Sequence, residues 1–313
     1  MSFTSLPFAW QGILLTLLGA LSRAFYVILN KKLLRIYSSR LIVVVNMLIA
    51  SAMLWTTILI FAKPSIYNLN LRNWSSGIIW PLLITAILNI AIQFLELRAL
   101  ELEDASLISP ISAAAPLLAV FTGIIILKEL PTMFGWFGII LISVGSYILS
   151  SGKTNILPKI FKPNHLAEFL VPWQALTQSR GVKLAFLAAF AGSISINFDK
   201  IVVLASGPLF LPATVTGFVG IIMLLTLKKN YWPKKISNKD LLLVLSAPLF
   251  FSAAIVLFAL GFYYGFASHS SSLRRTSILF VAILAGSMLG EKNHPERIFG
   301  AIIITIGAIL LAF

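Results

Sequence analysis

The sequence predicts an all-α membrane protein of about ten transmembrane helices, arranged as two inverted five-helix repeats. Hydrophobic residues make up 59% of its 313 residues and charged residues only 11%, whereas a soluble domain has about 25% charged residues. The apolar residues form repeated runs of about 20 residues, the length that crosses roughly 30 Å of hydrocarbon as a helix. Because these runs do not alternate strictly between apolar and polar residues, they exclude barrel strands.

Ten apolar runs, separated by charged breaks or by breaks with Pro and Gly, mark the expected helices. In chain order they cover residues 8–30, 41–62, 78–100, 106–127, 134–151, 181–204, 208–227, 241–264, 270–289 and 297–313. We expect a first five-helix repeat at residues 1–151, a polar linker at 152–180 and a second five-helix repeat at 181–313. No basic region or cleavage site accompanies the first run, which predicts a retained helix rather than a cleaved signal.

Matching residues at constant spacing indicate that the two halves are related by duplication. Near the start of each half, Gly12, Leu15, Leu18, Ala20 and Lys31 recur as Gly181, Leu184, Leu187, Ala189 and Lys200. Near the end, Ala105, Ser106, Leu117, Glu129, Gly138 and Gly145 recur as Ala267, Ser268, Leu279, Glu291, Gly300 and Gly307. An odd number of helices per repeat inverts the second half in the bilayer. Inverted repeats are typical of transporters whose solute site lies between the halves.

Several segments resemble the EamA-like family of the drug/metabolite transporter superfamily. They are ELRALELEDASLISPISAAAPLLAVFTGIIILKE from Glu96, followed by GWFGIILISVGSYIL, and in the second half RGVKLAFLAAF from Arg180 and SSLRRTSILFVAILAGSMLGEK from Ser271. The resemblance covers nearly the whole chain and implies a duplicated ten-helix fold. It also implies transport of an amino acid, another metabolite, a drug or a lipid-linked compound, without naming which.

Two carboxylates are expected inside the membrane, because most other acidic residues lie at helix ends or in loops. They are Glu96 and Asp199. An ionisable group at membrane depth costs roughly 2.5 to 3.5 kcal/mol or more, so each is a candidate for function. If transport is coupled to protons, one of the two is the expected protonation site. The alternative for Asp199 is an ion pair with Lys200 that fixes the end of its helix.

Polar side chains also form stripes on two of the expected helices, one in each half. Asn89, Gln93 and Glu96 lie on one face of the third helix, and Ser193, Asn197 and Lys200 on one face of the sixth, with Ser195 and Asp199 beside them. Lipid does not solvate such faces, so both stripes turn inward. They either line a substrate cavity or form hydrogen bonds between helices.

Arginines supply the remaining candidates for substrate binding. Arg23 lies well inside the first helix, with Tyr26 on the same face. It either binds a substrate carboxylate or phosphate or forms a permanent ion pair with Glu96 or Asp199. Arg274 and Arg275 lie early in the ninth helix, where they either bind substrate or extend to the membrane interface.

Other repeated or helix-bending residues have structural interpretations. Glu129 and Glu291 end the fourth and ninth helices, where capping or ordering of the turn is expected. The glycines of the fifth and tenth helices predict close helix packing. Pro110 and Pro116 predict a kink in the fourth helix.

Some functional classes are disfavoured by the sequence. The net charge of +14 comes mainly from Lys and Arg clusters between apolar runs, which set membrane orientation, so no nucleic-acid partner is expected. By the positive-inside rule these clusters place both termini away from the cytoplasm, whereas the family resemblance implies cytoplasmic termini. The orientation stays open. Cysteine is absent, and the three His residues lack ligand-like spacing, so neither a metal, a cofactor nor enzyme chemistry is expected.

Taken together, the sequence predicts a secondary transporter that moves a small metabolite, such as an amino acid or related compound, or a drug-like solute, by alternating access. The alternative within transport is a flippase for a lipid-linked or amphipathic substrate, and the alternative of another class is a membrane-embedded enzyme. The expected partners are a small-molecule substrate, the lipid bilayer and coupling protons, and a monomer suffices. We expect an integral protein of a bacterial inner (plasma) membrane.

Overall fold

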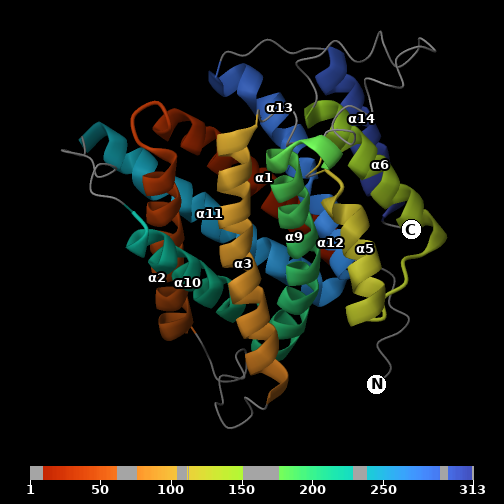
Figure 1. The fold of residues 1–313 in the computed structure, drawn as a ribbon, viewed down its shortest axis with the longest axis horizontal. Coiled ribbons are helices and arrows are strands. Elements are labelled where there is room, and N and C mark those ends of the chain that lie inside the picture. The colour runs from red at the N-terminus through yellow and green to blue at the C-terminus, as the bar shows by residue number, and fades with distance from the viewer. Residues whose placement is uncertain are drawn as a thin grey trace.

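The protein folds as a bundle of helices, shown by a computed structural model (Figure 1). The structure describes residues 10–61, 76–103, 111, 113–150, 176–227, 238–289 and 295–311. In the first half the helices are α1 (Trp10–Leu33), α2 (Ser39–Phe61), α3 (Ser76–Leu102), α5 (Ala115–Ile126) and α6 (Met133–Ser150). In the second half they are α9 (Arg180–Ser206), α10 (Phe210–Leu225), α11 (Asn238–Tyr264), α12 (Ala267–Arg274), α13 (Thr276–Leu289) and α14 (Pro295–Leu310).

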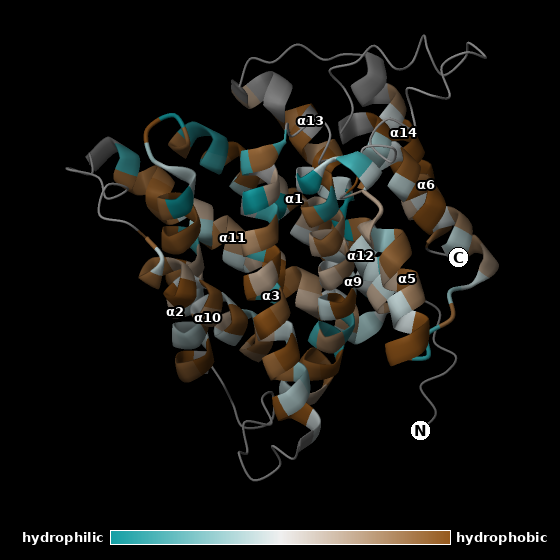
Figure 2. Cartoon of the chain, in the orientation of Figure 1, coloured by the Kyte–Doolittle hydropathy of each residue, from teal (hydrophilic) through white to brown (hydrophobic). Residues whose placement is uncertain are grey.

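The outer surface of the bundle is apolar, as expected of a protein embedded in a lipid bilayer. Leu59, Ile125 and Leu225 are 80%, 78% and 77% exposed, and Figure 2 shows hydrophobic residues along most of the helices. Among the described residues, five helices are long and apolar enough to cross a membrane by length and composition: α1, α2, α3, α9 and α11. Shorter apolar helices are α5, α6 and α10. The expected all-α membrane class is confirmed.

The two halves are inverted relative to each other, because their corresponding helices pack side by side in opposite directions. On α6 and α14, Gly138 lies against Gly307 and Gly145 against Gly300, so one helix ascends as the other descends. On α2 and α10, Ser51 donates a hydrogen bond to the carbonyl of Ala213 at 2.7 Å, while Leu48 contacts Gly220 further along. Both pairs are antiparallel, which is what inversion of the second repeat requires.

Contacts between the first helix of one repeat and the third helix of the other also support the inversion. The most extensive helix contacts are between α3 and α9 and between α1 and α11, which pair the first helix of each repeat with the third helix of the other. The repeated glycines lie at equivalent places in these contacts. Gly12 at the start of α1 packs against Tyr264 at the end of α11, and Gly181 at the start of α9 packs against Glu103 after α3.

The structure corrects two details of the expected helices. The ninth is not continuous, because α12 ends at Arg274 and α13 begins at Thr276, with hydrogen bonds of the tighter three-residue type at Arg275. Pro116 does not kink the fourth helix, because it lies in the first turn of α5, where the missing N–H costs nothing. Pro110 and Glu291 lie outside the described residues, as does most of the linker expected at 152–180. The repeat boundaries themselves stay a prediction.

The glycine contact between α6 and α14 gives a test of this packing. A Cβ atom at Gly138 would lie 2.7 Å from the carbonyl oxygen of Gly307, so Gly138→Ala forces the two backbones apart. We expect it to lower the free energy of unfolding by about 1–3 kcal/mol, the usual cost of overpacking, measured by thermal unfolding in detergent. The control is Gly192→Ala, whose added Cβ meets nothing closer than Ile92 at 3.9 Å. Equal loss of stability in both variants would contradict the contact.

Candidate substrate site

Three arginines gather where α1 meets the break between α12 and α13. The guanidinium group of Arg274 lies over the ring of Phe258, 4.6 Å from its centroid, and Phe258 is one of the largest fully buried side chains. The backbone of α1 reaches the same ring at Gly19, one helical turn before Arg23. Arg23 interacts electrostatically with both Arg274 and Arg275. This position against a buried ring does not fit extension of Arg274 to the membrane interface.

Two carboxylates approach this group of arginines from α3 and α9. Glu96 interacts electrostatically with Arg23 and Arg275, and Asp199 with Arg274. Among the described residues, however, no ion pair within 4.0 Å involves any of the three arginines. The arginines and Asp199 are half-buried, and Glu96 is exposed. We call this group the charged cluster (Arg23, Arg274, Arg275, Glu96 and Asp199); its members keep partial exposure, and no direct pair with a described residue holds its arginines.

Asp199 is held by a hydrogen-bond network between α3 and α9. Thr85 donates a hydrogen bond to the Asp199 carboxylate and lies 2.8 Å from the Ser195 hydroxyl. The Asn89 amide donates to Ser195 at 2.9 Å and to the Thr85 carbonyl at 2.9 Å. Asp199 does not pair with Lys200, which binds Glu129 instead. Thr85 is not among the residues expected from the sequence, although its position four residues before Asn89 extends the polar stripe by one turn.

The equivalent interface between α1 and α11 has an aromatic pair at the position of this network, next to a hydrogen bond from Ser22 to the Phe250 carbonyl at 2.9 Å. By the repeat spacing, Tyr26 of α1 is the counterpart of Ser195 of α9. By the spacing that relates α3 to α11, Asn89 is the counterpart of Phe251. Where Asn89 hydrogen-bonds Ser195, Tyr26 instead packs against Phe251 with ring centroids 4.9 Å apart. Tyr26 also packs against an apolar cluster of α1, α2 and α11. This gives it a structural contact, and its role in substrate binding stays a prediction.

The stripe of Ser193 and Asn197 forms hydrogen bonds between helices, which is one of the two expected alternatives. Both side chains are fully buried against α5. The Asn197 amide donates to the Thr122 hydroxyl and to the Ser193 carbonyl, each at 2.8 Å, and Thr122 donates to the same carbonyl at 2.8 Å. The adjacent stripe of α9, Ser195 and Asp199, is the one that meets α3. Ser193 and Asn197 therefore join helices in this conformation, and neither is accessible to a solute.

Comparison with known proteins settles the family. The sequence profile of the EamA-like transporter family matches residues 10–151 and 179–313. The chain belongs to the EamA-like transporter family. The resemblance inferred from the sequence is confirmed, and with it an integral membrane protein with a transporter fold.

Two further comparisons bear on the fold but do not identify a substrate. No curated protein matches this EamA-like chain. A solved structure described as "Crystal structure of protein" is similar over 97% of this chain and 94% of that chain, with 14% sequence identity and a TM-score of 0.66. At that identity the likeness shows the shared fold alone.

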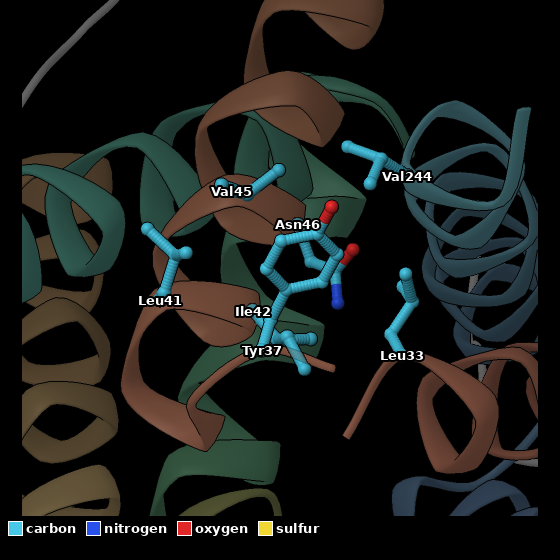
Figure 3. A pocket seen from close by; sticks show the side chains of 7 residues that line it. All are labelled: Leu33, Tyr37, Leu41, Ile42, Val45, Asn46 and Val244. Carbon is cyan, nitrogen blue, oxygen red and sulfur yellow. The ribbon is translucent and has the colours of Figure 1, made fainter. Parts of the chain in front are cut away.

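The cavity that the described residues enclose outside the charged cluster is too small and too apolar for a metabolite. A small cavity between α1, α2 and α11, of about 30 Å³, is lined almost wholly by apolar side chains (Figure 3), whereas metabolite pockets occupy roughly 300–1,000 Å³. Gln93 is half-buried on the stripe of α3, and no hydrogen bond joins it to another described residue. Among the described residues no group of His, Asp and Glu is placed to hold a metal ion.

The contact between Asn197 and Thr122 can be separated from substrate binding by its effect on stability. Asn197→Ala and Thr122→Val should each destabilise the folded protein, because each removes one side of a buried interhelical hydrogen bond. A double-mutant cycle should give a coupling energy of about 0.6 kcal/mol and at most about 1.7 kcal/mol, as measured for such bonds in membranes. Thermal unfolding of the four proteins in detergent measures it. Strictly additive effects would show that the two groups do not interact.

Proposed function

We propose that the chain is a secondary transporter that moves a small metabolite across the bilayer by alternating access, with the charged cluster as its substrate site. The observation that carries the proposal is this cluster, which combines side chains of both repeats, keeps partial exposure and makes no direct ion pair through its arginines among the described residues. Charges at membrane depth are costly unless they serve a function or find a partner. A solute that brings complementary charge supplies the partner.

The chemistry of the cluster favours a substrate that carries a carboxylate or phosphate. Guanidinium groups bind such anions through two parallel hydrogen bonds, and Arg23, Arg274 and Arg275 approach one region from two sides. Glu96 and Asp199 are available to a substrate ammonium group. An amino acid or a related compound satisfies both kinds of group, and a drug-like solute with an acidic group satisfies the first.

Alternating access follows from the inverted repeats. Two similar halves that face opposite sides of the membrane have two conformations of similar energy, in which the halves exchange roles. Rocking of one half against the other moves α3 against α9 and α1 against α11, the two contacts that enclose the cluster. A bound solute is thereby exposed first to one side and then to the other.

Substitutions in the charged cluster and at Gln93, one turn before Glu96 on α3, test the site. Arg23→Ala and Gln93→Ala should abolish counterflow of a radiolabelled amino acid or organic acid in proteoliposomes, because each removes a polar group from the inward face of α1 or α3. Both proteins should remain folded by thermal unfolding. The control is Lys183→Met, an exposed cation on α9, which should retain wild-type flux. Normal counterflow by both Arg23→Ala and Gln93→Ala would remove the proposed site.

The same assay separates the alternatives. A flippase would move a fluorescent lipid between leaflets and show no counterflow of water-soluble solutes. An enzyme would release a chemically altered product. Saturable exchange of an unchanged solute is the outcome that supports the transporter.

Proton coupling is proposed to depend on Asp199 or Glu96. Replacing the coupling carboxyl, as Asp199→Asn or Glu96→Gln, should remove accumulation driven by a pH gradient but leave solute exchange at equal pH, because exchange does not require net proton transfer. Uptake into proteoliposomes with and without an imposed gradient measures both. If both variants still accumulate solute in response to the gradient, neither carboxyl couples transport to protons.

A further inference from the structure

A buried ion pair joins the two repeats at one end of the bundle. The ammonium group of Lys200 on α9 pairs with the Glu129 carboxylate, which follows α5 in the first repeat. The side chains are only 10% and 14% exposed. Lys200 also donates to the Gly265 carbonyl at 2.7 Å, and the second Glu129 oxygen accepts the backbone N–H of Ala267 at 3.0 Å.

These bonds close a ring through three segments. Glu129 lies between α5 and α6, Lys200 lies near the end of α9, and Gly265 and Ala267 flank the junction of α11 and α12. The carboxylate caps the N-terminus of α12, the helix that ends at the arginines of the charged cluster. The pair therefore ties the first repeat to the half of the ninth helix that carries Arg274.

At the opposite end, part-buried hydrogen bonds join the two repeats: Ser179 donates to Glu103 at 2.6 Å and Tyr37 to Asp240 at 3.1 Å. The ion pairs between described residues at that end lie within the first repeat, where Glu101 pairs with Arg98 and with Arg40. The three side chains are 42%, 63% and 36% exposed, and hydrogen bonds from Arg98 and Arg40 lower the pKa of Glu101. Exposed pairs of this type are weak because water and salt screen them. A buried pair loses far more when one partner is removed, since the other charge is left unpaired.

We propose that the Lys200–Glu129 pair is the latch that holds the Lys200 end of the bundle closed, and that it breaks when this end opens to admit or release solute. The inference rests on the proposed alternating access. Opening that end separates the first repeat from the second and so pulls Glu129 away from Lys200 and Ala267. Binding at the charged cluster reaches the latch through α12, whose first residue is held by Glu129 and whose last residue is Arg274.

The duplicated sequence assigns an equivalent lysine to the opposite end. Lys31 is the repeat counterpart of Lys200 and lies at the end of α1, where its side chain is exposed. Inversion of the repeats places it on the other face of the membrane. Replacing Lys200 should favour the conformation that is open at the Lys200 end. Replacing Lys31 should favour the conformation that is open at the other end.

Sided cysteine labelling tests the latch, because the chain has no cysteine of its own. A reporter cysteine is introduced as Gln93→Cys, and a membrane-impermeant maleimide is added to one side or the other of proteoliposomes. Separate single-cysteine proteins identify the sides: Lys128→Cys reacts at the Lys200 end, and Gln178→Cys reacts at the other end. Lys200→Met and Glu129→Gln should each increase labelling from the Lys128 side several-fold and decrease it from the Gln178 side. Lys200→Arg, which keeps the cation, should resemble wild type, as should the control Lys183→Met.

A cross-link provides a second test, made in protein that keeps Gln93 and compared before and after reduction. A bifunctional, reducible reagent across Glu129→Cys and Lys200→Cys should abolish counterflow, and reduction should restore it. Unchanged labelling in Lys200→Met and Glu129→Gln, equal increases from both sides, or counterflow by the cross-linked protein would overturn the latch. So would a shift in Lys31→Met in the same direction as in Lys200→Met. Labelling needs no substrate, so sided shifts without counterflow of any solute would contradict the proposed transport and not the latch.

Discussion

The rest of the structure depends on the poor solvation of polar groups by hydrocarbon. Each polar group of a spanning helix must find its partner inside the bundle, so polar side chains decide which helix faces touch. Thr85, Asn89 and Ser195 join α3 to α9 in this way, and Asn197 joins α9 to α5 through Thr122. With the polar faces turned inward, the outer faces are free to be apolar, as they are on α2, α5 and α10.

Two identical inverted repeats would form two equal interfaces. In this protein the two, α3 with α9 and α1 with α11, differ. The contact between α3 and α9 is polar at Asn89 and Ser195, while the equivalent contact between α1 and α11 is aromatic at Phe251 and Tyr26. A packed aromatic pair is stabilised by buried area and ring geometry, and it needs no aligned donor and acceptor. A hydrogen-bond network is directional and holds Asp199 in place. As a result, hydrogen bonds fix a carboxylate, Asp199, on the α3–α9 side of the charged cluster, whereas ring packing takes the equivalent position between α1 and α11.

The helices and the glycine contacts could be predicted from sequence because both follow from local patterns, run length in one case and repeated small residues in the other. The partner of each polar stripe could not. Periodicity shows that Ser193 and Asn197 share a face, but Ser195 and Asp199 share another, and nothing local says which one meets α3. The Arg275 break was also missed, because the surrounding residues include neither Pro nor Gly, the usual signs of an interrupted helix.

Arg275 occupies the break between α12 and α13, directly after Arg274. Successive residues of an α-helix point about 100° apart, and the tighter three-residue turn widens this angle to about 120°. At Arg275 the backbone tightens in this way, its N–H bonding to the Ser272 carbonyl at 2.9 Å and its carbonyl accepting from Ile278 at 3.0 Å. Arg274 interacts with Asp199 and Arg275 with Glu96. Two adjacent guanidinium groups that point in different directions can each meet a carboxylate, because the two carboxylates come from different helices, α9 and α3.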